Sequence, residues 1–396
     1  MISNSRRKFG AHSRRGWLSG ALGTSAIIVL VGASASAVAG QGVVAQRQAN
    51  AVSSVVAADE AAVSAAEAPV TKWQGPTDTL KPPKNVTLGI VECASVVNGC
   101  VTPAQGAAAA AAVLGWKSKI YDGQGTPAGQ NNAVTEALSA GSNAILMVGV
   151  DPTAIQSSLQ EAASKHVPVG DLGQGIAPGH GIDFQVGANY VKDGQIEGEW
   201  IVAASGGHAD VLPTNDKEYT STVELTDAAV QEIQKCSGCS LLPQQYFVST
   251  EIGNGLGQRI AELLQKNPKV NYIVGAYDPA VDDMVPAFEN AGIAGRLSLV
   301  SNVGTPENLG FIAKGEVQKA DIVFDNTYMG WAGVDQVIRA LLHKPLWKDK
   351  GVTDPRFMYD ENTPSHLIVK GNLPAHGAAW HAAFNTAAQF SKHWGV

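Results

Sequence analysis

The chain has 396 residues, of which 45% are hydrophobic and 16% are charged, and its formal net charge at pH 7 is -7. A chain of this length normally divides into two domains, and its apolar content suffices for two buried cores. The modest acidic balance, without a basic face, argues against nucleic acid binding.

The first 39 residues look like an export signal. Arg14-Arg15 directly precede the apolar run Leu18–Val31, and Arg6-Arg7 form a second, weaker pair. This arrangement is similar to the twin-arginine translocation motif, and small residues at 35–39 offer cleavage sites. The apolar run is short for a transmembrane helix. We expect a periplasmic or secreted protein after cleavage, with an uncleaved anchor as the alternative.

Residues 40–84 are rich in Ala, Val, Ser and Gln and end in Lys81-Pro82-Pro83-Lys84. Low complexity of this kind predicts a mobile linker. Residues 57–68 have helical propensity but no clear partner face.

From Val86 onward, apolar runs that suit buried strands alternate with helical stretches. Thr102, Thr126 and Asp151 each precede a proline and are predicted to cap helices at regular spacing. This rhythm predicts parallel βαβ units. Asp151 follows the strand AILMVGV, and Asp278 follows NYIVGAY in a similar unit. Because open α/β sheets bind ligands at the carboxyl ends of their strands, we expect two similar halves that face a cleft.

From about Val86 to Leu373 the chain resembles the type I periplasmic sugar-binding proteins, the ribose-binding-protein-like receptors of ABC importers. The order of several stretches carries this resemblance: VTLGIVECAS, AILMVGVDPTAI with VPVGDLG, VGANYVKDGQIEGEWI, NYIVGAYDPAVDDMVPAFENAG, GTPENLGFIAKGEVQKADIVFDNTYMGWAGVDQVI and HLIVKGNL. Repressors that share the fold carry an N-terminal helix-turn-helix where this chain has its export signal.

The resemblance implies an α/β fold of two doubly wound parallel-sheet lobes, joined by a three-segment hinge. Residues 85–187 with 325–344 would form the N-terminal lobe, and residues 188–324 with 345–396 the C-terminal lobe and tail. The expected hinge segments are Val186–Asn189, Val303–Thr305 and Phe324–Asn326.

The same resemblance implies a set of ligand contacts around the cleft. They are Ser95, Asp151, Asn189, Tyr277, Asp278, Phe324 and Asp325. Asp151 matches the family's ligand carboxylate after the third strand, and Asn189 matches an Asn at the first hinge. An Asp before Pro is equally a good helix N-cap, so both roles stay open for Asp151. Tyr277 stands at the family's contact position, which leaves Asp278 mainly as a cap.

Four polar positions of the family are apolar or missing here. Pro152 replaces an Arg, Val303 a second carboxylate and Phe324 a hinge Gln, while the Arg of the second lobe has no counterpart in TNDKEYTSTVELTD. Buried unpaired polar groups are costly, so the pocket should hold a ligand with fewer hydroxyls than a free sugar. If the match is shifted by one residue, the polar neighbours Asn302 and Asp325 face the ligand instead.

The four cysteines are Cys93, Cys100, Cys236 and Cys239. In an exported protein they are expected to form disulfides, and three connectivities are possible. Proximity in the sequence favours Cys93 with Cys100 and Cys236 with Cys239. Cys236 and Cys239 follow a helix, where its dipole disfavours a reactive thiolate. A four-cysteine zinc site is disfavoured because only one pair has ligand spacing. We expect no metal and no cofactor.

We therefore expect a solute receptor that acts as a monomer and delivers a small molecule to a membrane ABC permease. Enzymatic activity is not expected, because the sequence has no phosphate loop, no Gly-x-Ser-x-Gly elbow and no HExxH motif. Two alternatives remain: a receptor that presents its ligand to a chemosensor, and a periplasmic hydrolase that uses Asp151 and Asp278.

Overall fold

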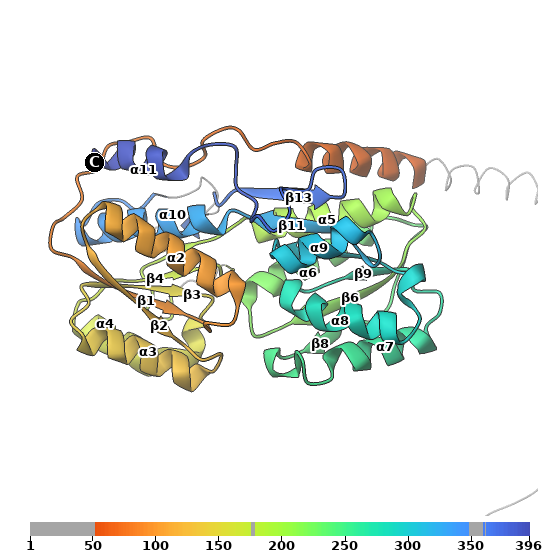
Figure 1. Cartoon of the computed structure of the whole chain (residues 1–396), viewed down its shortest axis with the longest axis horizontal. Helices are drawn as coiled ribbons and strands as arrows, with labels where there is room; N and C mark the ends of the chain where they lie inside the picture. Colours follow the sequence, from red (N-terminus) through yellow and green to blue (C-terminus); the bar gives the residue numbers. More distant parts are fainter. Residues whose placement is uncertain (1–51, 176–178, 348–358, 361) are drawn as a thin grey trace, which may run out of the picture. The chain divides into compact units, whose positions relative to one another are not determined.

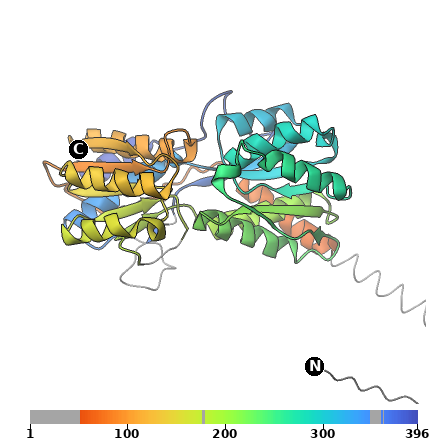
Figure 2. The same cartoon turned by 90° about the horizontal axis from the view of Figure 1, so that it is seen from below.

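The computed structural model describes residues 52–175, 179–347, 359–360 and 362–396. The expected export signal, residues 1–39, lies outside this part of the chain. The described residues between 52 and 396 form two α/β lobes, each built on one main sheet (Figures 1 and 2).

The first lobe is built on a six-stranded parallel sheet in the order β12-β5-β4-β3-β1-β2. Its strands are β1 (Thr87–Glu92), β2 (Lys117–Asp122), β3 (Ala144–Val148), β4 (Val169–Leu172), β5 (Phe184–Val186) and β12 (Tyr359–Asp360). Its helices are α2 (Asn98–Val113), α3 (Pro127–Ser139), α4 (Gln156–Ser164), α10 (Asn326–Leu341) and α11 (Thr386–Trp394). Every residue of β3 is buried, as expected for a parallel strand covered by helices on both faces.

The second lobe has a seven-stranded sheet in the order β13-β11-β10-β9-β6-β7, with β8 also paired to β6. Its strands are β6 (Asp210–Asp216), β7 (Ser240–Leu241), β8 (Gln245–Phe247), β9 (Tyr272–Val274), β10 (Ser298–Val303), β11 (Gln318–Phe324) and β13 (Ser365–Val369). Its helices are α5 (Tyr190–Ala204), α6 (Thr220–Ile233), α7 (Leu256–Lys266), α8 (Asp278–Asn290) and α9 (Pro306–Lys314). Among the described strands of this sheet, only β13 runs antiparallel to its neighbour, β11.

Three 3₁₀ turns complete the described elements: η1 (Pro152–Ile155), η2 (Ser249–Glu251) and η3 (Ala294–Arg296). No helix in the described ranges is both long and apolar enough to span a membrane.

The predicted helix starts are correct where the capping threonine precedes the first turn. Thr126 accepts a hydrogen bond from the backbone N–H of Gly129, and Thr305 accepts one from Asn308. The start predicted at Thr102 is wrong, because α2 already begins at Asn98 and contains Pro103. Helix α2 thus takes up Cys100, whose disulfide to Cys93 ties the first turn to the end of β1.

The chain passes between the two sheets after β5, after β11 and between β12 and β13. It also passes between the lobes after the helix of residues 52–66 and between β13 and α11. The first two crossings coincide with the hinges expected at Val186–Asn189 and Phe324–Asn326. The hinge expected at Val303–Thr305 is wrong, because this segment joins β10 to α9 within the second lobe. The crossing before β13 replaces it, since β13 belongs to the second sheet while β12 belongs to the first.

The N-terminal segment is not a mobile linker over residues 52–84. Residues 52–66 form a helix that packs Val55 and Val63 against the core of the second lobe. Trp73 meets the rings of aromatic residues in the first lobe, among them Tyr328 at 5.6 Å between centroids. Leu80 is only 2% exposed. Composition misled here, because a few large apolar side chains in a polar stretch are enough to anchor it.

The C-terminal tail also departs from its expected place. Strand β13 joins the second lobe, but α11 packs against α10 of the first lobe, where Phe390 and Trp394 are buried in the core. The assignment of all residues 345–396 to the second lobe is therefore wrong for β12 and α11.

Candidate functional site

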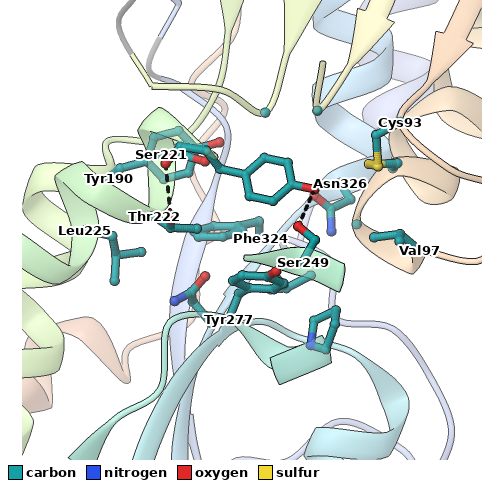
Figure 3. Close-up of a pocket in the computed structure, with 18 of the residues that line it drawn as sticks. Cys93, Val97, Tyr190, Ser221, Thr222, Leu225, Ser249, Tyr277, Phe324 and Asn326 are labelled. Carbon is teal, nitrogen blue, oxygen red and sulfur yellow. Dashed lines mark hydrogen bonds between the residues drawn. A yellow bond between two sulfur atoms is a disulfide. The ribbon is translucent and has the colours of Figure 1, made fainter. Parts of the chain in front are cut away.

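A cavity of about 370 Å³ lies between the two lobes (Figure 3). The first lobe contributes Val97, the Cys93–Cys100 disulfide, Asn326 and Met329 to its lining. The second lobe contributes residues from the starts of α5 and α6, from η2, and from the carboxyl ends of β9, β10 and β11: Tyr190, Tyr219, Ser221, Thr222, Leu225, Ser249, Tyr277, Asn302, Val303 and Phe324. The cavity thus lies where open α/β sheets place their ligands.

Aromatic rings dominate the second-lobe side of the cavity. Tyr190 and Phe324 pack edge to face with 5.7 Å between ring centroids, and Tyr219 and Tyr277 do so at 5.9 Å. Such pairs fix ring orientation, so these faces form a preorganised apolar wall.

Several polar groups at the wall are already paired within the protein. The Tyr277 hydroxyl donates to Asp216 Oδ2 at 2.8 Å, and Ser249 Oγ lies 3.1 Å from the same oxygen and 3.2 Å from the Tyr219 hydroxyl. Asn302 donates through Nδ2 to the Ala276 carbonyl at 3.0 Å and to Glu197 Oε1 at 3.2 Å. These bonds hold the side chains in place and reduce their capacity to bind hydroxyl groups of a ligand.

No Asp, Glu, His, Lys or Arg side chain lines this cavity among the described residues. Asp216 lies behind Tyr277 and Ser249, and burial, as the main cause, raises the pKa of its carboxyl. A ligand in the cavity would therefore meet rings, aliphatic groups, hydroxyls and amides, but no formal charge in the described lining.

Two of the seven predicted ligand residues, Tyr277 and Phe324, line the cavity. Ser95 instead donates through Oγ to Asp122 at 2.7 Å. Asp151 accepts from the backbone N–H and the hydroxyl of Thr153, both at 2.8 Å, which gives it the N-cap role at η1.

Asn189 and Asp325 are also cap residues in this structure. Asn189 accepts from the backbone N–H of Lys192 at the start of α5, and Asp325 accepts from Tyr328 at the start of α10. Asp325 also accepts from the backbone N–H of Ala382 at 3.1 Å. Of the two residues expected to face the ligand after a one-residue shift, Asn302 lines the cavity and Asp325 does not.

The role predicted for Asp278 as the cap of its own helix is wrong. The residue before α8 is Tyr277, and Asp278 Oδ2 accepts instead from the backbone N–H groups of Gly304 and Thr305, at 3.0 and 2.7 Å. Burial, followed by the charge of neighbouring Asp321, raises the pKa of Asp278 well above its usual value. Asp278 therefore ties α8 to the β10–α9 turn beneath the cavity.

That turn carries strain at the cavity wall. Val303, which lines the cavity, has φ +111°, a conformation that is a genuine outlier for a β-branched residue. Such strain persists only where surrounding structure enforces it, and here Asp278 binds the next two backbone N–H groups.

Sequence reasoning missed most of the lining, including Tyr190, Tyr219, Thr222, Leu225 and Met329. The available signal was the position of Tyr219 just after β6, since open α/β sheets bind ligands at the carboxyl ends of their strands. Tyr190 directly follows Asn189, so the first crossing supplies a ring to the cavity instead of an amide.

The predicted disulfides are confirmed as Cys93–Cys100 and Cys236–Cys239. The first pair lines the cavity at the end of β1. The second follows α6, away from the cavity lining.

Comparison with known proteins agrees with this geometry. Residues 98–345 match the family described as "Periplasmic binding protein domain". A search of curated proteins finds no match.

Solved structures of ABC transporter solute-binding proteins share the fold at low sequence identity. One from Burkholderia graminis, in complex with D-arabinose, has a TM-score of 0.64 and 17% identity, with 76% of this chain and 100% of that chain covered. One from Agrobacterium vitis, bound with alpha-D-tagatopyranose, has a TM-score of 0.63 and 19% identity over 74% and 97% of the chains. One from Mycobacterium smegmatis, with bound glycerol, has a TM-score of 0.62 and 17% identity over 75% and 100%.

Proposed function

The chain belongs to the family of periplasmic binding protein domains, and from this premise we propose that it is a receptor that captures a small organic ligand between its lobes and delivers it to an ABC-type importer. The observation that carries this proposal is the cavity lined from both lobes, at the carboxyl ends of the second-lobe strands. Membership of the family implies a periplasmic location. Its members and the similar structures are binding proteins.

We propose further that the ligand is less polar than a free sugar. Plain sugars, polyols and glycerol are bound in the similar structures, where every hydroxyl needs a partner once water is excluded. Here the wall is aromatic and aliphatic, and the hydroxyls of Tyr277 and Ser249 are held by bonds within the protein. A ligand with an apolar or aromatic face and one polar edge, such as an aryl-substituted or deoxygenated sugar, fits this lining.

The polar edge would meet the groups near the lobe boundary. Asn326 at the start of α10 and Ser221 at the start of α6 both line the cavity, from opposite lobes. A ligand that bonds to both would link the lobes and favour the closed arrangement. A hydrolase that uses Asp151 and Asp278 has no support from this geometry, because neither residue lines the cavity.

Ligand binding is expected to close the lobes, because the ligand gains contacts from both sides. Small-angle X-ray scattering of the protein, freed of any co-purified ligand, should show a smaller radius of gyration when the ligand is added. The melting temperature should rise with ligand concentration, since a ligand that binds only the folded state stabilises it. Tight binding without compaction would contradict the hinged mechanism.

Export by the twin-arginine route remains a proposal that rests on the sequence alone. Replacing Arg14 and Arg15 together by Lys should leave precursor in the cytoplasm while the arginines at 6 and 7 stay intact. Cell fractionation with an antibody measures this. The matched control replaces Arg6 and Arg7 by Lys and should be exported. Normal periplasmic accumulation of the first double variant would contradict the assignment.

We propose that the protein acts as a monomer, with the permease as its protein partner. A receptor that presents the same ligand to a chemosensor would use the same cavity and differ only in that partner.

A further inference from the structure

The helix formed by residues 52–66 carries an acidic residue on its inward face. Val55, Asp59 and Val63 are spaced i, i+4 and i+8 and therefore share one side of the helix. Val55 and Val63 pack against the second-lobe core, and Asp59 between them is only 5% exposed. Figures 1 and 2 show this helix, coloured red, beside α5. A carboxyl in the middle of an apolar contact is costly to bury unless something pairs with it.

Two carboxyl groups of the second lobe lie close to the carboxyl group of Asp59. Glu199 belongs to α5 and Glu232 to α6, and one oxygen from each of the three residues lies within 4.8 Å of the others. The two helices come close at Gly198, where a Cβ would lie 2.6 Å from the Cβ of Glu232. This approach brings Glu199 and Glu232 together beneath the N-terminal helix.

One carboxyl oxygen in this cluster lacks a partner. Asp59 Oδ2 is buried and has no hydrogen-bond partner among the described residues. The neighbouring cation, Lys235, binds Glu232 at 2.6 Å, and its side chain is 60% exposed. Lys235 is the lysine bonded to the cluster, and the charge of Lys192 also acts on Glu199.

The electrostatics of the cluster agree with a missing positive charge. Burial, followed by the charge of Glu232, raises the pKa of Asp59 to about 6. Burial, followed by the charges of Glu232 and Asp59, raises the pKa of Glu199 to about 7. Both shifts reflect carboxyl groups that are buried close to one another.

We propose that Asp59, Glu199 and Glu232 form a calcium site that fastens the N-terminal helix to the second lobe. Carboxylate oxygens are the ligands that Ca²⁺ prefers, and it accepts one or two oxygens from each carboxylate in flexible geometry. Mg²⁺ demands near-ideal octahedral geometry at shorter distances, which three carboxylates from three separate helices do not readily supply. A divalent ion would also bring positive charge to the buried, unpaired Asp59 Oδ2.

The site can be tested by calorimetric titration of the full-length, EDTA-treated protein with CaCl₂ at constant ionic strength. We expect one site at neutral pH. Asp59→Asn should weaken Ca²⁺ binding at least tenfold. The matched control is Glu60→Gln, on the exposed side of the same helix, which should bind Ca²⁺ like the wild type.

Thermal unfolding separates this site from a merely structural role of Asp59. Without metal, Asp59→Asn should melt at or above the wild-type temperature, because a repulsive buried carboxylate is removed. Addition of Ca²⁺ should raise the melting temperature of the wild type but not that of Asp59→Asn. Glu199→Gln should show the same loss and provides a second variant if the first fails to fold. Absence of Ca²⁺ binding by the wild type at millimolar concentration, or unchanged affinity in both variants, would overturn the proposal.

Discussion

Replacing Asp335 by alanine is expected to lower the free energy of unfolding by about 3–5 kcal/mol, the usual cost of removing one partner from a buried ion pair. Asp335 is 2% exposed and accepts from Arg339 Nε and from the indole N–H of Trp394, both at 2.8 Å. Its Oδ1 also lies 3.0 Å from His393 Nε2. Its removal leaves donors of α10 and α11 buried without this acceptor.

The same network anchors the N-terminal segment to the first lobe. Asp78 binds the two terminal nitrogens of Arg339 at 2.7 and 3.1 Å, and the Leu80 N–H donates to the His393 carbonyl at 3.0 Å. Loss of Asp335 should therefore loosen both ends of the chain. Limited proteolysis should cut the Asp335→Ala protein within residues 68–84 or near α11 sooner than the wild type.

Thermal unfolding measures the main effect, and we expect the melting temperature to fall by roughly 4–7 °C, because the unfolding entropy is about 2.1 cal/mol/K for each folded residue. The control is Glu161→Ala, which breaks an exposed i,i+4 pair with Lys165 and should cost no more than about 0.5 kcal/mol. Equal melting temperatures for the two variants would show that the network does not hold α11 in place.

This stabilisation should also depend on pH. Burial lowers the pKa of His393, but the hydrogen bonds and charges of Asp335 and Asp78 together outweigh it, so the net shift is upward from 6.5. A histidine whose pKa is raised by folding stabilises the folded state. This contribution to the free energy of unfolding is complete below the pKa of the unfolded chain, and it is lost as the pH rises through the pKa of the folded state. The difference in the free energy of unfolding between the wild type and Asp335→Ala should therefore become smaller above the folded-state pKa of His393.

Replacing Ser221 by tryptophan is expected to weaken ligand binding at least about 100-fold, which corresponds to about 2.8 kcal/mol. Ser221 lies in the first turn of α6 and lines the cavity. An indole there would occupy space that the ligand needs and would oppose closure of the first lobe. Calorimetry with the tightest-binding compound of the panel described below provides the measurement.

The control for this variant is Gln231→Trp, which places the same ring on the exposed side of α6. It should leave affinity within about twofold of the wild type, since surface substitutions away from the site change little. If Ser221→Trp also binds like the wild type while its fold is intact, the ligand does not occupy this cavity.

The fold could be predicted from the sequence because strand, cap and turn residues agree locally with the global arrangement. Thr126-Pro127 and Thr305-Pro306 mark helix starts by their own chemistry, and the buried strand Ala144–Val148 is apolar throughout. The order of such units along the chain was enough to indicate two lobes.

The site could be predicted only in part, because the direction of a side chain at a strand end depends on how the next helix begins. Asp151, Asn189 and Asp325 are polar residues at strand ends, yet each uses its side-chain oxygen to cap the element that follows. Sequence position alone does not reveal whether a carboxylate faces its own backbone or the cleft.

The polarity of the pocket could be predicted because it depends on residue types rather than on exact contacts. Val303 and Phe324 do line the cavity, as expected from their place in the family pattern. The anchoring of the N-terminal segment could not be predicted from residue types, because it depends on the contacts of two individual residues. Trp73 and Leu80 make these contacts, but they lie in a stretch whose overall composition is of low complexity.

The ligand-polarity proposal is tested most directly by calorimetric titration of the ligand-stripped protein with a fixed panel. The panel pairs D-ribose and D-glucose with phenyl β-D-glucopyranoside and uncharged small aromatic amides. We predict that an aromatic amide, which has no hydroxyl to leave unpaired, binds at least about 100-fold more tightly than either plain sugar, because each unsatisfied buried hydroxyl costs about 1–3 kcal/mol. Tight binding of unmodified ribose or glucose, with the aromatic compounds inert, would contradict this proposal.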